Sequence, residues 1–192
     1  CTLNELLNNR AKLREELRTE IPKIFERSGS VFVYATTEPE EALLLGGNTA
    51  TLWHGRITQF GRTPDVYRRP VNATTARVFS DPPMNFLTVS KDGPEMSFSG
   101  GQSVPTPEGL LGQPNGTYTA GFRPNHLELN PNVGGAMAFK TTLRVTEITG
   151  SETFVHLDHQ GQRWVGLVHG VQSLTPGQPL EVFLNPAHVY IF

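Results

Sequence analysis

Histidines close to an acidic residue are the first candidates for chemistry in this 192-residue sequence. His156 and His159 enclose Asp158 in a stretch with strand character, and imidazole and carboxylate groups at short spacing can bind zinc. Side chains three positions apart on a strand point to opposite faces, however, so the pattern predicts a pair of surface histidines and no metal site. The only cysteine, Cys1, rules out an intrachain disulfide, a cysteine-based zinc site and a Cys–His nucleophile.

Phosphate chemistry has its own residue requirements. A glycine-rich loop must end in Lys and Ser or Thr, because backbone amides and the ammonium cradle the phosphates and the hydroxyl holds Mg²⁺. None of the lysines, Lys12, Lys23, Lys91 and Lys140, follows a glycine, and no apolar strand ends in Asp-Glu. We therefore expect no cofactor in this chain and no ATP hydrolysis by it alone.

Charge and composition restrict the classes of partner. The net charge is -2, and the second half of the chain has few lysines and arginines, so the basic groove that nucleic acid needs is not expected. No apolar run approaches the roughly 20 residues that span a bilayer. The polar N-terminus has no signal-peptide pattern, and we therefore expect a cytoplasmic protein.

The first part of the chain combines helical and strand patterns. Apolar residues at helical spacing predict a helix from Leu3 to about Arg27, bent at Pro22. Val31–Ala35 has the pattern of a buried strand, and a turn at Thr36–Pro39 leads into a helix that ends at Leu45. A hairpin is then expected, with strands Thr49–Trp53 and Ile57–Phe60 on either side of His54 and Gly55. Two short helices follow, one at Pro64–Arg69 and a last one up to Phe79.

Ser80–Pro83 is the best candidate for a linker. Beyond it short strands alternate with turn residues, and many short strands at regular spacing predict a small barrel. The expected strands are Phe86–Ser90, Met96–Ser99, Thr117–Phe122, Ala138–Thr149, Glu152–Asp158, Arg163–His169, Leu180–Leu184 and Val189–Phe192.

A series of short segments shares its order and residues with one protein family. They are Ala11–Leu17, Val31–Glu38, Gly55–Gly61, Val66–Pro70, Pro83–Leu87, Gly121–Leu127, Gly150–Thr153 and Asn185–Phe192. Together they resemble the ATP-binding subunits of carbohydrate ABC importers, of which the maltose-importer ATPase is the best known.

The resemblance implies an α+β chain with two parts. Residues 1–82 would be the end of a RecA-like α/β nucleotide-binding domain, and residues 83–192 an all-β OB-type (TOBE) regulatory barrel. It implies ATP and Mg²⁺ as cofactors of the full-length parent only. The implied partners are a second ATPase subunit, in a homo- or heterodimer, and membrane permease subunits that hold the protein at the inner membrane; no nucleic acid is implied.

Two segments of the family's nucleotide site are altered. Where the family has Ser-Asn-Leu-Asp in its D-loop, this chain has a leucine followed by Asn8, Asn9 and Arg10, with the arginine in place of an acid. The family's switch loop reads Thr-His-Asp, whereas this chain has Thr-Thr-Glu, with Thr37 at the histidine position and Glu38 after it. Because a hydroxyl reaches less far than an imidazole, the resemblance implies slow hydrolysis in the parent.

Two further motifs have competing interpretations. Phe98–Gln102 resembles the ABC signature Leu-Ser-Gly-Gly-Gln, but Pro105 and Pro107 follow it, so a β-turn is expected in place of a helix. Arg123 and His126 lie in the family's Gly-Phe-Arg-Pro-x-His-Leu signature and would either bind an anion or partner, or serve a structural role in which Arg123 bonds across a loop.

The sequence thus leaves two classes of function. The first is a portion of a transporter subunit that serves dimerisation and regulation. The second is a free-standing β-barrel module that binds a small anion or sugar. A phosphate loop encoded upstream of Cys1 would decide for the first class.

Overall fold

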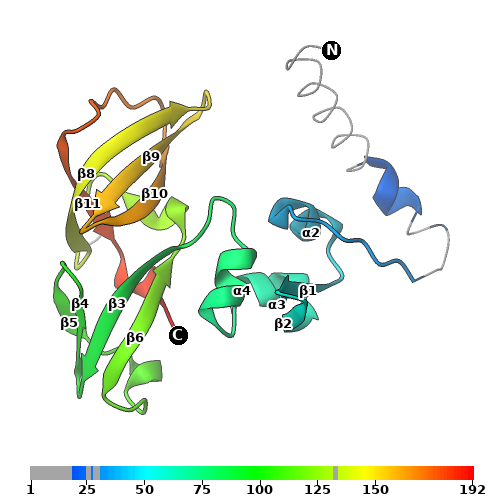
Figure 1. Ribbon diagram of the computed structural model, residues 1–192, viewed down its shortest axis with the longest axis horizontal. Coiled ribbons are helices and arrows are strands. Elements are labelled where there is room, and N and C mark those ends of the chain that lie inside the picture. Colours follow the sequence, from blue (N-terminus) through cyan, green and yellow to red (C-terminus); the bar gives the residue numbers. More distant parts are fainter. Residues whose placement is uncertain (1–18, 25–26, 28–30, 132–133) are drawn as a thin grey trace. The chain divides into compact units, whose positions relative to one another are not determined.

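The computed structural model describes residues 19–24, 27, 31–131 and 134–192. The chain divides into two compact units, Cys1–Pro70 and Val71–Phe192, and Figure 1 shows the elements of each. The predicted linker Ser80–Pro83 lies within the second unit. Within the described ranges no helix is both long and apolar enough to cross a bilayer.

The described part of the first unit contains the predicted hairpin and the helices predicted after the Thr36–Pro39 turn and at Pro64–Arg69. Of the helix predicted from Leu3 to about Arg27, residues 3–18 and 25–26 lie outside the described residues. Residues 19–24 are helical. Helix α2 begins at Pro39, whose fixed φ suits a first turn, and ends before Gly46, which adopts a φ of 70°. The hairpin turns at His54 and Gly55, both at positive φ, as a two-residue turn requires. The elements are α2 (Pro39–Leu45), β1 (Asn48–Trp53), β2 (Arg56–Arg62) and α3 (Thr63–Arg68).

The structure corrects the prediction of a strand at Val31–Ala35. Residues 31–36 have no regular structure, and Val31 and Val33 are 94% and 95% exposed. A strand needs a neighbour to satisfy its backbone groups, and no described residue pairs with this segment. The apolar residues of this segment are typical of a buried strand, but they are exposed.

The second unit consists mainly of two five-stranded antiparallel sheets. One has the order β10-β9-β8-β11-β7 and the other β12-β6-β3-β4-β5. The predicted barrel-like, mostly β architecture is confirmed, although the short strands β5 and β7 are missing from the prediction. The elements are α4 (Ala73–Val78), β3 (Asn85–Asp92), β4 (Glu95–Phe98), β5 (Ser103–Pro105), η1 (Glu108–Leu110), β6 (Gly116–Phe122), η2 (Pro124–His126), β7 (Leu127–Glu128), β8 (Met137–Ile148), β9 (Glu152–His159), β10 (Gln162–His169), β11 (Pro179–Leu184), η3 (Pro186–His188) and β12 (Tyr190–Ile191).

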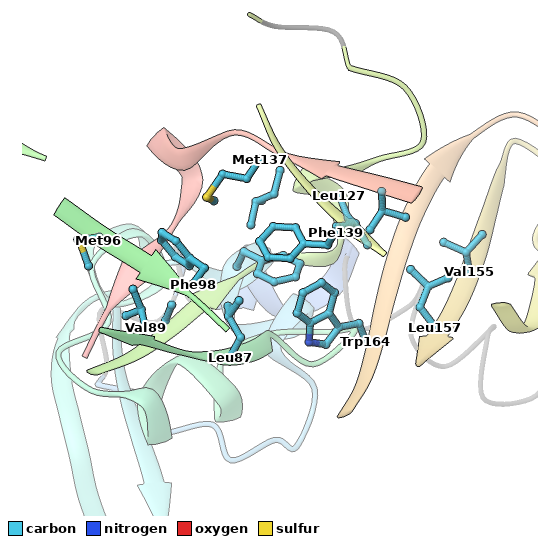
Figure 2. Close-up of a cluster of buried hydrophobic side chains, with 14 of the residues drawn as sticks. Leu87, Val89, Met96, Phe98, Leu127, Met137, Phe139, Val155, Leu157 and Trp164 are labelled. Atoms are coloured by element: carbon cyan, nitrogen blue, oxygen red, sulfur yellow. The ribbon is translucent and has the colours of Figure 1, made fainter. Parts of the chain in front are cut away.

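The core of this unit collects inward-facing residues of both sheets (Figure 2). In β9 every second residue is buried, beginning with Thr153, and β3 follows the same alternation. Phe122, Phe139 and Trp164 are almost fully buried, and Trp164 meets the other two rings edge to face, at centroid distances of 4.9 and 5.3 Å. Aromatic packing therefore fills the centre of the barrel.

Two side chains join the sheets through backbone groups. Asn85, on β3, donates through Nδ2 to the carbonyl oxygen of Val165 (2.8 Å) and accepts through Oδ1 from its N–H (2.7 Å). Trp164 Nε1 donates to the carbonyl oxygen of Phe86 at 3.1 Å. Strands β3 and β10 belong to different sheets, so these bonds close the barrel at this seam.

The predicted surface histidine pair is correct for His156 only. His156 points outward and its Nε2 lies 3.1 Å from a carboxylate oxygen of Glu147. His159 is 2% exposed because the alternation of β9 turns it into the core. Within the described ranges, no group of three or more His, Cys, Asp or Glu side chains is placed to hold a metal ion.

Candidate functional site

The segment before α2 is organised by hydroxyl groups. Thr36 and Tyr34 both donate to the carboxylate of Glu41, and the N–H of Glu38 donates to Thr36 Oγ1 at 2.9 Å. Partial burial, followed by the hydrogen bond and charge of Glu41, raises the pKa of the Tyr34 phenol. The hydroxyl of Thr36 therefore serves the conformation of the chain as it enters the helix.

Thr37 is in a different situation. Its side chain is exposed and makes no hydrogen bond to any described residue. Glu38 occupies the position before the first helical residue, and Glu40 and Glu41 follow in the first turn. A hydroxyl at Thr37 can reach an outside group, but the local carboxylates disfavour a bare anion beside it. Asn8, Asn9 and Arg10 lie outside the described residues.

Arg123 is buried at the end of β6, where only 4% of the residue is exposed. Its Nη1 lies 3.2 Å from Ser80 Oγ and 3.4 Å from the carbonyl oxygen of Phe79, and its guanidinium lies over the ring of Tyr190 at 5.8 Å. The side chain thus links the segment before β3 to the last strand, across more than 40 residues of sequence on either side.

His126 stacks on His188, with ring centroids 4.1 Å apart and planes inclined by 29°. Burial, followed by the charges of His188 and Arg123, lowers the pKa of His126 to about 4. Its Nδ1 is buried and has no hydrogen-bond partner in the described part of the chain. At neutral pH His126 is therefore uncharged, which permits the close stack and leaves no second cation beside Arg123.

The Arg123 cluster, formed by Arg123, His126, His188, Tyr190 and Ser80, includes residues that the sequence reasoning missed. His188 and Tyr190 belong to the closing segment Asn185–Phe192, where the pairing of β12 with β6 brings them beside the signature. The only sequence signal was that both segments match the same family, which does not say that they meet. The structure does not bring this cluster and Thr37 into one unit.

The motif that resembles the ABC signature forms a turn, as predicted. The N–H of Gly101 donates to Phe98 O (3.1 Å) and the N–H of Phe98 to Gln102 O (3.3 Å), with Gly100 at a φ of 66°. The turn connects β4 to β5 and is not followed by a helix. It therefore offers no helix N-terminus to a phosphate.

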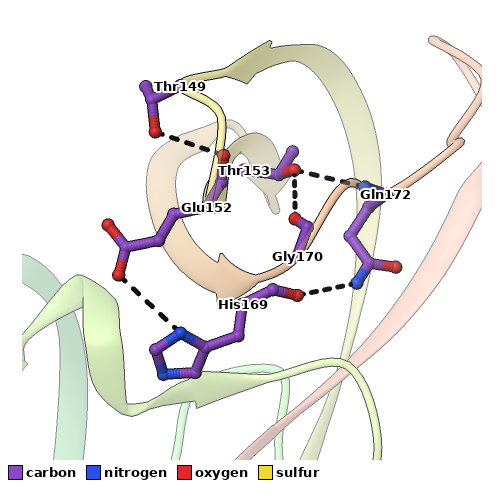
Figure 3. A network of polar contacts seen from close by, with 6 residues as sticks. All are labelled: Thr149, Glu152, Thr153, His169, Gly170 and Gln172. Carbon is purple, nitrogen blue, oxygen red and sulfur yellow. Dashed lines mark hydrogen bonds and ion pairs between the residues drawn. The ribbon is translucent and has the colours of Figure 1, made fainter.

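The family segment Gly150–Thr153 also forms a turn, shown in Figure 3. The fully buried Thr153 hydroxyl donates to Gly170 O (2.7 Å) and accepts from the N–H of Gln172 (3.2 Å). Both the N–H and hydroxyl of Thr149 lie within hydrogen-bond distance of Glu152 O. These bonds therefore hold the turn between β8 and β9 against the segment that follows β10.

Comparison with known proteins gives one domain match and a set of similar sequences. Residues 120–192 match the TOBE domain model. The chain is 29% identical over 191 residues to the sulfoquinovosyl glycerol transport ATP-binding protein SmoE of Agrobacterium fabrum, which covers 97% of this chain and 53% of that protein. It is 33% identical over 153 residues to the sn-glycerol-3-phosphate import ATP-binding protein UgpC of Rhizobium meliloti, covering 79% of this chain and 41% of that protein.

The chain spans about half the length of the curated relatives it matches. Among solved structures, the cytoplasmic molybdate-binding protein ModG is similar at a TM-score of 0.42 and 14% identity, over 56% of this chain and 94% of that one. The resemblance to ABC importer ATP-binding subunits that the sequence segments carry is confirmed by the curated relatives and the TOBE match.

Proposed function

We propose a role for this chain from two observations. It contains a TOBE domain, and 97% of its length is similar to part of the ATP-binding subunit of an ABC importer. We propose that it forms the C-terminal portion of such a subunit, for a sugar or a related solute such as a glycerol phosphate. The observation that carries the proposal is the near-complete similarity to transport ATP-binding proteins, across both units.

The two units would then have different tasks. The first would be the end of a RecA-like nucleotide-binding domain. In support, Val66 is the one hydrophobic residue of this unit that is fully buried among those described, while Val31, Val33 and Phe60 are well exposed. Apolar faces of this kind are suited to packing against further strands of a larger sheet.

The second unit would be the regulatory domain of the subunit. Its two sheets enclose a continuous core, so it presents a finished surface for regulation and dimer contacts. Its partners would be a second ATPase subunit, in a homo- or heterodimer, and membrane permease subunits, with no nucleic acid among them. This arrangement would place the protein in the cytoplasm, peripheral to the inner membrane.

ATP and Mg²⁺ would be cofactors of the whole subunit, where they supply the transferable phosphoryl group and its charge neutralisation. Thr37 fits a position beside a phosphate because its side chain is exposed and its hydroxyl makes no hydrogen bond to the described residues. Glu38 beside it fits such a position only with a cation present. These residues would hold a water less effectively than an imidazole does, which favours nucleotide binding with slow hydrolysis. Asn8, Asn9 and Arg10 would correspond to the family's D-loop, and Arg10 in place of an acid argues against the family's D-loop contacts across a dimer.

A chimera tests the proposal. The aligned part of R. meliloti UgpC is replaced by this chain, and ATPase activity and uptake of glycerol 3-phosphate are measured in cells that lack UgpC. We expect a soluble protein that binds ATP and restores uptake, at a reduced rate that Thr37→His raises. A folded, ATP-binding chimera that restores no uptake, with or without Thr37→His, would contradict the proposed function.

A further inference from the structure

Asn115 lies immediately before β6 and is the only asparagine in the sequence that is followed by glycine. The side-chain amide of an asparagine can be attacked by the backbone nitrogen of the next residue, and a side chain on that residue hinders the approach. Gly116 has no side chain, and a Cβ built on it would meet no atom within 4 Å. Both residues are exposed, so water and base can reach the amide.

The amide of Asn115 is bound to the neighbouring strand and its turn. The N–H of Gly93 donates to Asn115 Oδ1 at 2.8 Å, and Asn115 Nδ2 donates to a carboxylate oxygen of Asp92 at 2.8 Å. A backbone N–H can only donate and a carboxylate can only accept, so these two bonds fix the orientation of the amide. Because β3 and β6 are neighbours in the sheet (Figure 1), the bonds connect the start of β6 to the end of β3.

Lys91 approaches the same amide from the buried side of β3. It is only 5% exposed, because the alternation of the strand turns it away from solvent and leaves Asp92 on the outer face. Its Nζ lies 3.4 Å from Asn115 Oδ1, and no carboxylate in the described part of the chain lies at ion-pair distance from it. A buried ammonium without a counter-ion is unfavourable, and here it meets only a neutral amide oxygen.

A carboxylate in place of this amide would suit Lys91 better. It would still accept from the N–H of Gly93, and it would give the buried ammonium a charged partner, whose hydrogen bond is stronger than that of a neutral amide. It would lose the bond to Asp92 and repel that carboxylate. Asp92 is exposed, however, so water screens the repulsion more than it screens the attraction to Lys91.

We propose that Asn115 is a modification site, at which the folded chain slowly exchanges the side-chain amide for a carboxylate that pairs with Lys91. The Gly116 nitrogen gives its proton to a base in solution and bonds to Asn115 Cγ, the Cγ–Nδ2 bond breaks, and Nδ2 takes a proton from water and leaves as ammonia. Water then opens the cyclic imide at one of its two carbonyl groups and leaves aspartate or isoaspartate. The reaction consumes only water, and it does not depend on the proposed transport function.

The hydrogen bonds of Asn115 should limit the rate. Ring closure requires the amide to turn away from its partners, so the folded chain reacts only when these bonds open. Asp92→Ala removes one of them and should speed the reaction by roughly 3- to 10-fold. Glu95→Ala is the matched control, because Glu95 is an exposed carboxylate directly opposite Asp92 in the same hairpin and makes no bond to Asn115.

Peptide mapping by mass spectrometry follows the reaction in the full chain at mildly alkaline pH. We expect an acid to appear at Asn115 well before Asn125, an exposed asparagine that is followed by histidine. Two results would overturn the proposal: no acid at Asn115 in the folded chain when the urea-unfolded chain has converted fully, or equal rates in Asp92→Ala and Glu95→Ala.

A double-mutant cycle tests the pairing with Lys91. Asn115→Asp should leave the urea midpoint of the second unit nearly unchanged, and should lower it in a Lys91→Met background, where no cation meets the carboxylate. Lys91→Gln takes the place of Lys91→Met if that variant does not fold. Equal shifts of the midpoint with and without the lysine would contradict the pairing and overturn the proposal.

Discussion

The bonds between Asn85 and Val165 allow a test of how the two sheets of the second unit are held together. Asn85→Leu keeps a side chain of similar size in a position that is 3% exposed but removes both the donor and the acceptor. The N–H and the C=O of Val165 then lose their partners at the seam between β3 and β10.

The expected cost follows from those two backbone groups. A buried polar group left unpaired costs about 1–3 kcal/mol, and Val165 is half-buried, so water recovers part of that energy. We therefore expect a loss of about 2–4 kcal/mol in the free energy of unfolding. Asn85→Asp should also destabilise the unit, because it keeps the acceptor for the Val165 N–H but places a carboxylate oxygen against the Val165 carbonyl.

Urea unfolding followed by Trp164 fluorescence measures the effect. Trp164 is 1% exposed in the second unit and Trp53 is 44% exposed in the first, so a Trp53→Phe background isolates the relevant signal. With an m-value of about 1–3 kcal/mol per molar urea, the midpoint should fall by about 1–2 M. Asn130→Leu, at an exposed position, is the control. If Asn85→Leu shifts the midpoint no more than Asn130→Leu does, the two hydrogen bonds do not hold the seam.

Three further outcomes are expected. Gly101→Ala places a methyl group 2.3 Å from Phe139 and should cost about 1–3 kcal/mol in thermal unfolding, whereas Gly109→Ala, with nothing within 4 Å, should be near neutral. The pKa of His126 is lowered to about 4, so stability should be complete above about pH 6.5 and decline toward pH 4 by roughly 1–2 kcal/mol, after allowance for its half-exposed ring. His126→Gln should flatten this decline in urea titrations at several pH values, and His169→Gln should not. Calorimetry should detect no micromolar binding of Mg-ATP to the chain alone, since no lysine follows a glycine.

The strands of the second unit were predictable because their sequence alternates with the pleat. In β3 and β9 every second residue is buried, and the central ones (Leu87 and Val89, Val155 and Leu157) are apolar, so the sequence pattern and the burial agree there. Strand β7 has two residues, Leu127 and Glu128, which is too short for any periodicity to be seen. The segment from Val31 failed for another reason: its composition favours a strand, but a strand also requires a partner, which local composition does not specify.

The candidate site was partly predictable. Arg123 and His126 were found because they lie in one contiguous signature. Their contacts with Ser80 and His188 come from segments about 40 and 60 residues away in the chain, and no periodicity in a single sequence reports such a meeting. For the same reason His159 was assigned to the surface: the alternation placed His156 and His159 on opposite faces but did not say which face was the core.

The turn at Ser99–Gln102 shows that a motif has to be interpreted through what its residues contact. In a working ABC signature, the small residues would allow a phosphate to approach a helix N-terminus. In this chain Gly100 is required by a positive φ, and Gly101 by the buried ring of Phe139. Two glycines in succession are therefore the solution that the barrel needs to bring a tight turn against an aromatic core. The four residues Ser-Gly-Gly-Gln are explained in this chain by packing. The contacts of the turn therefore argue against a nucleotide site, in addition to the prolines that follow it.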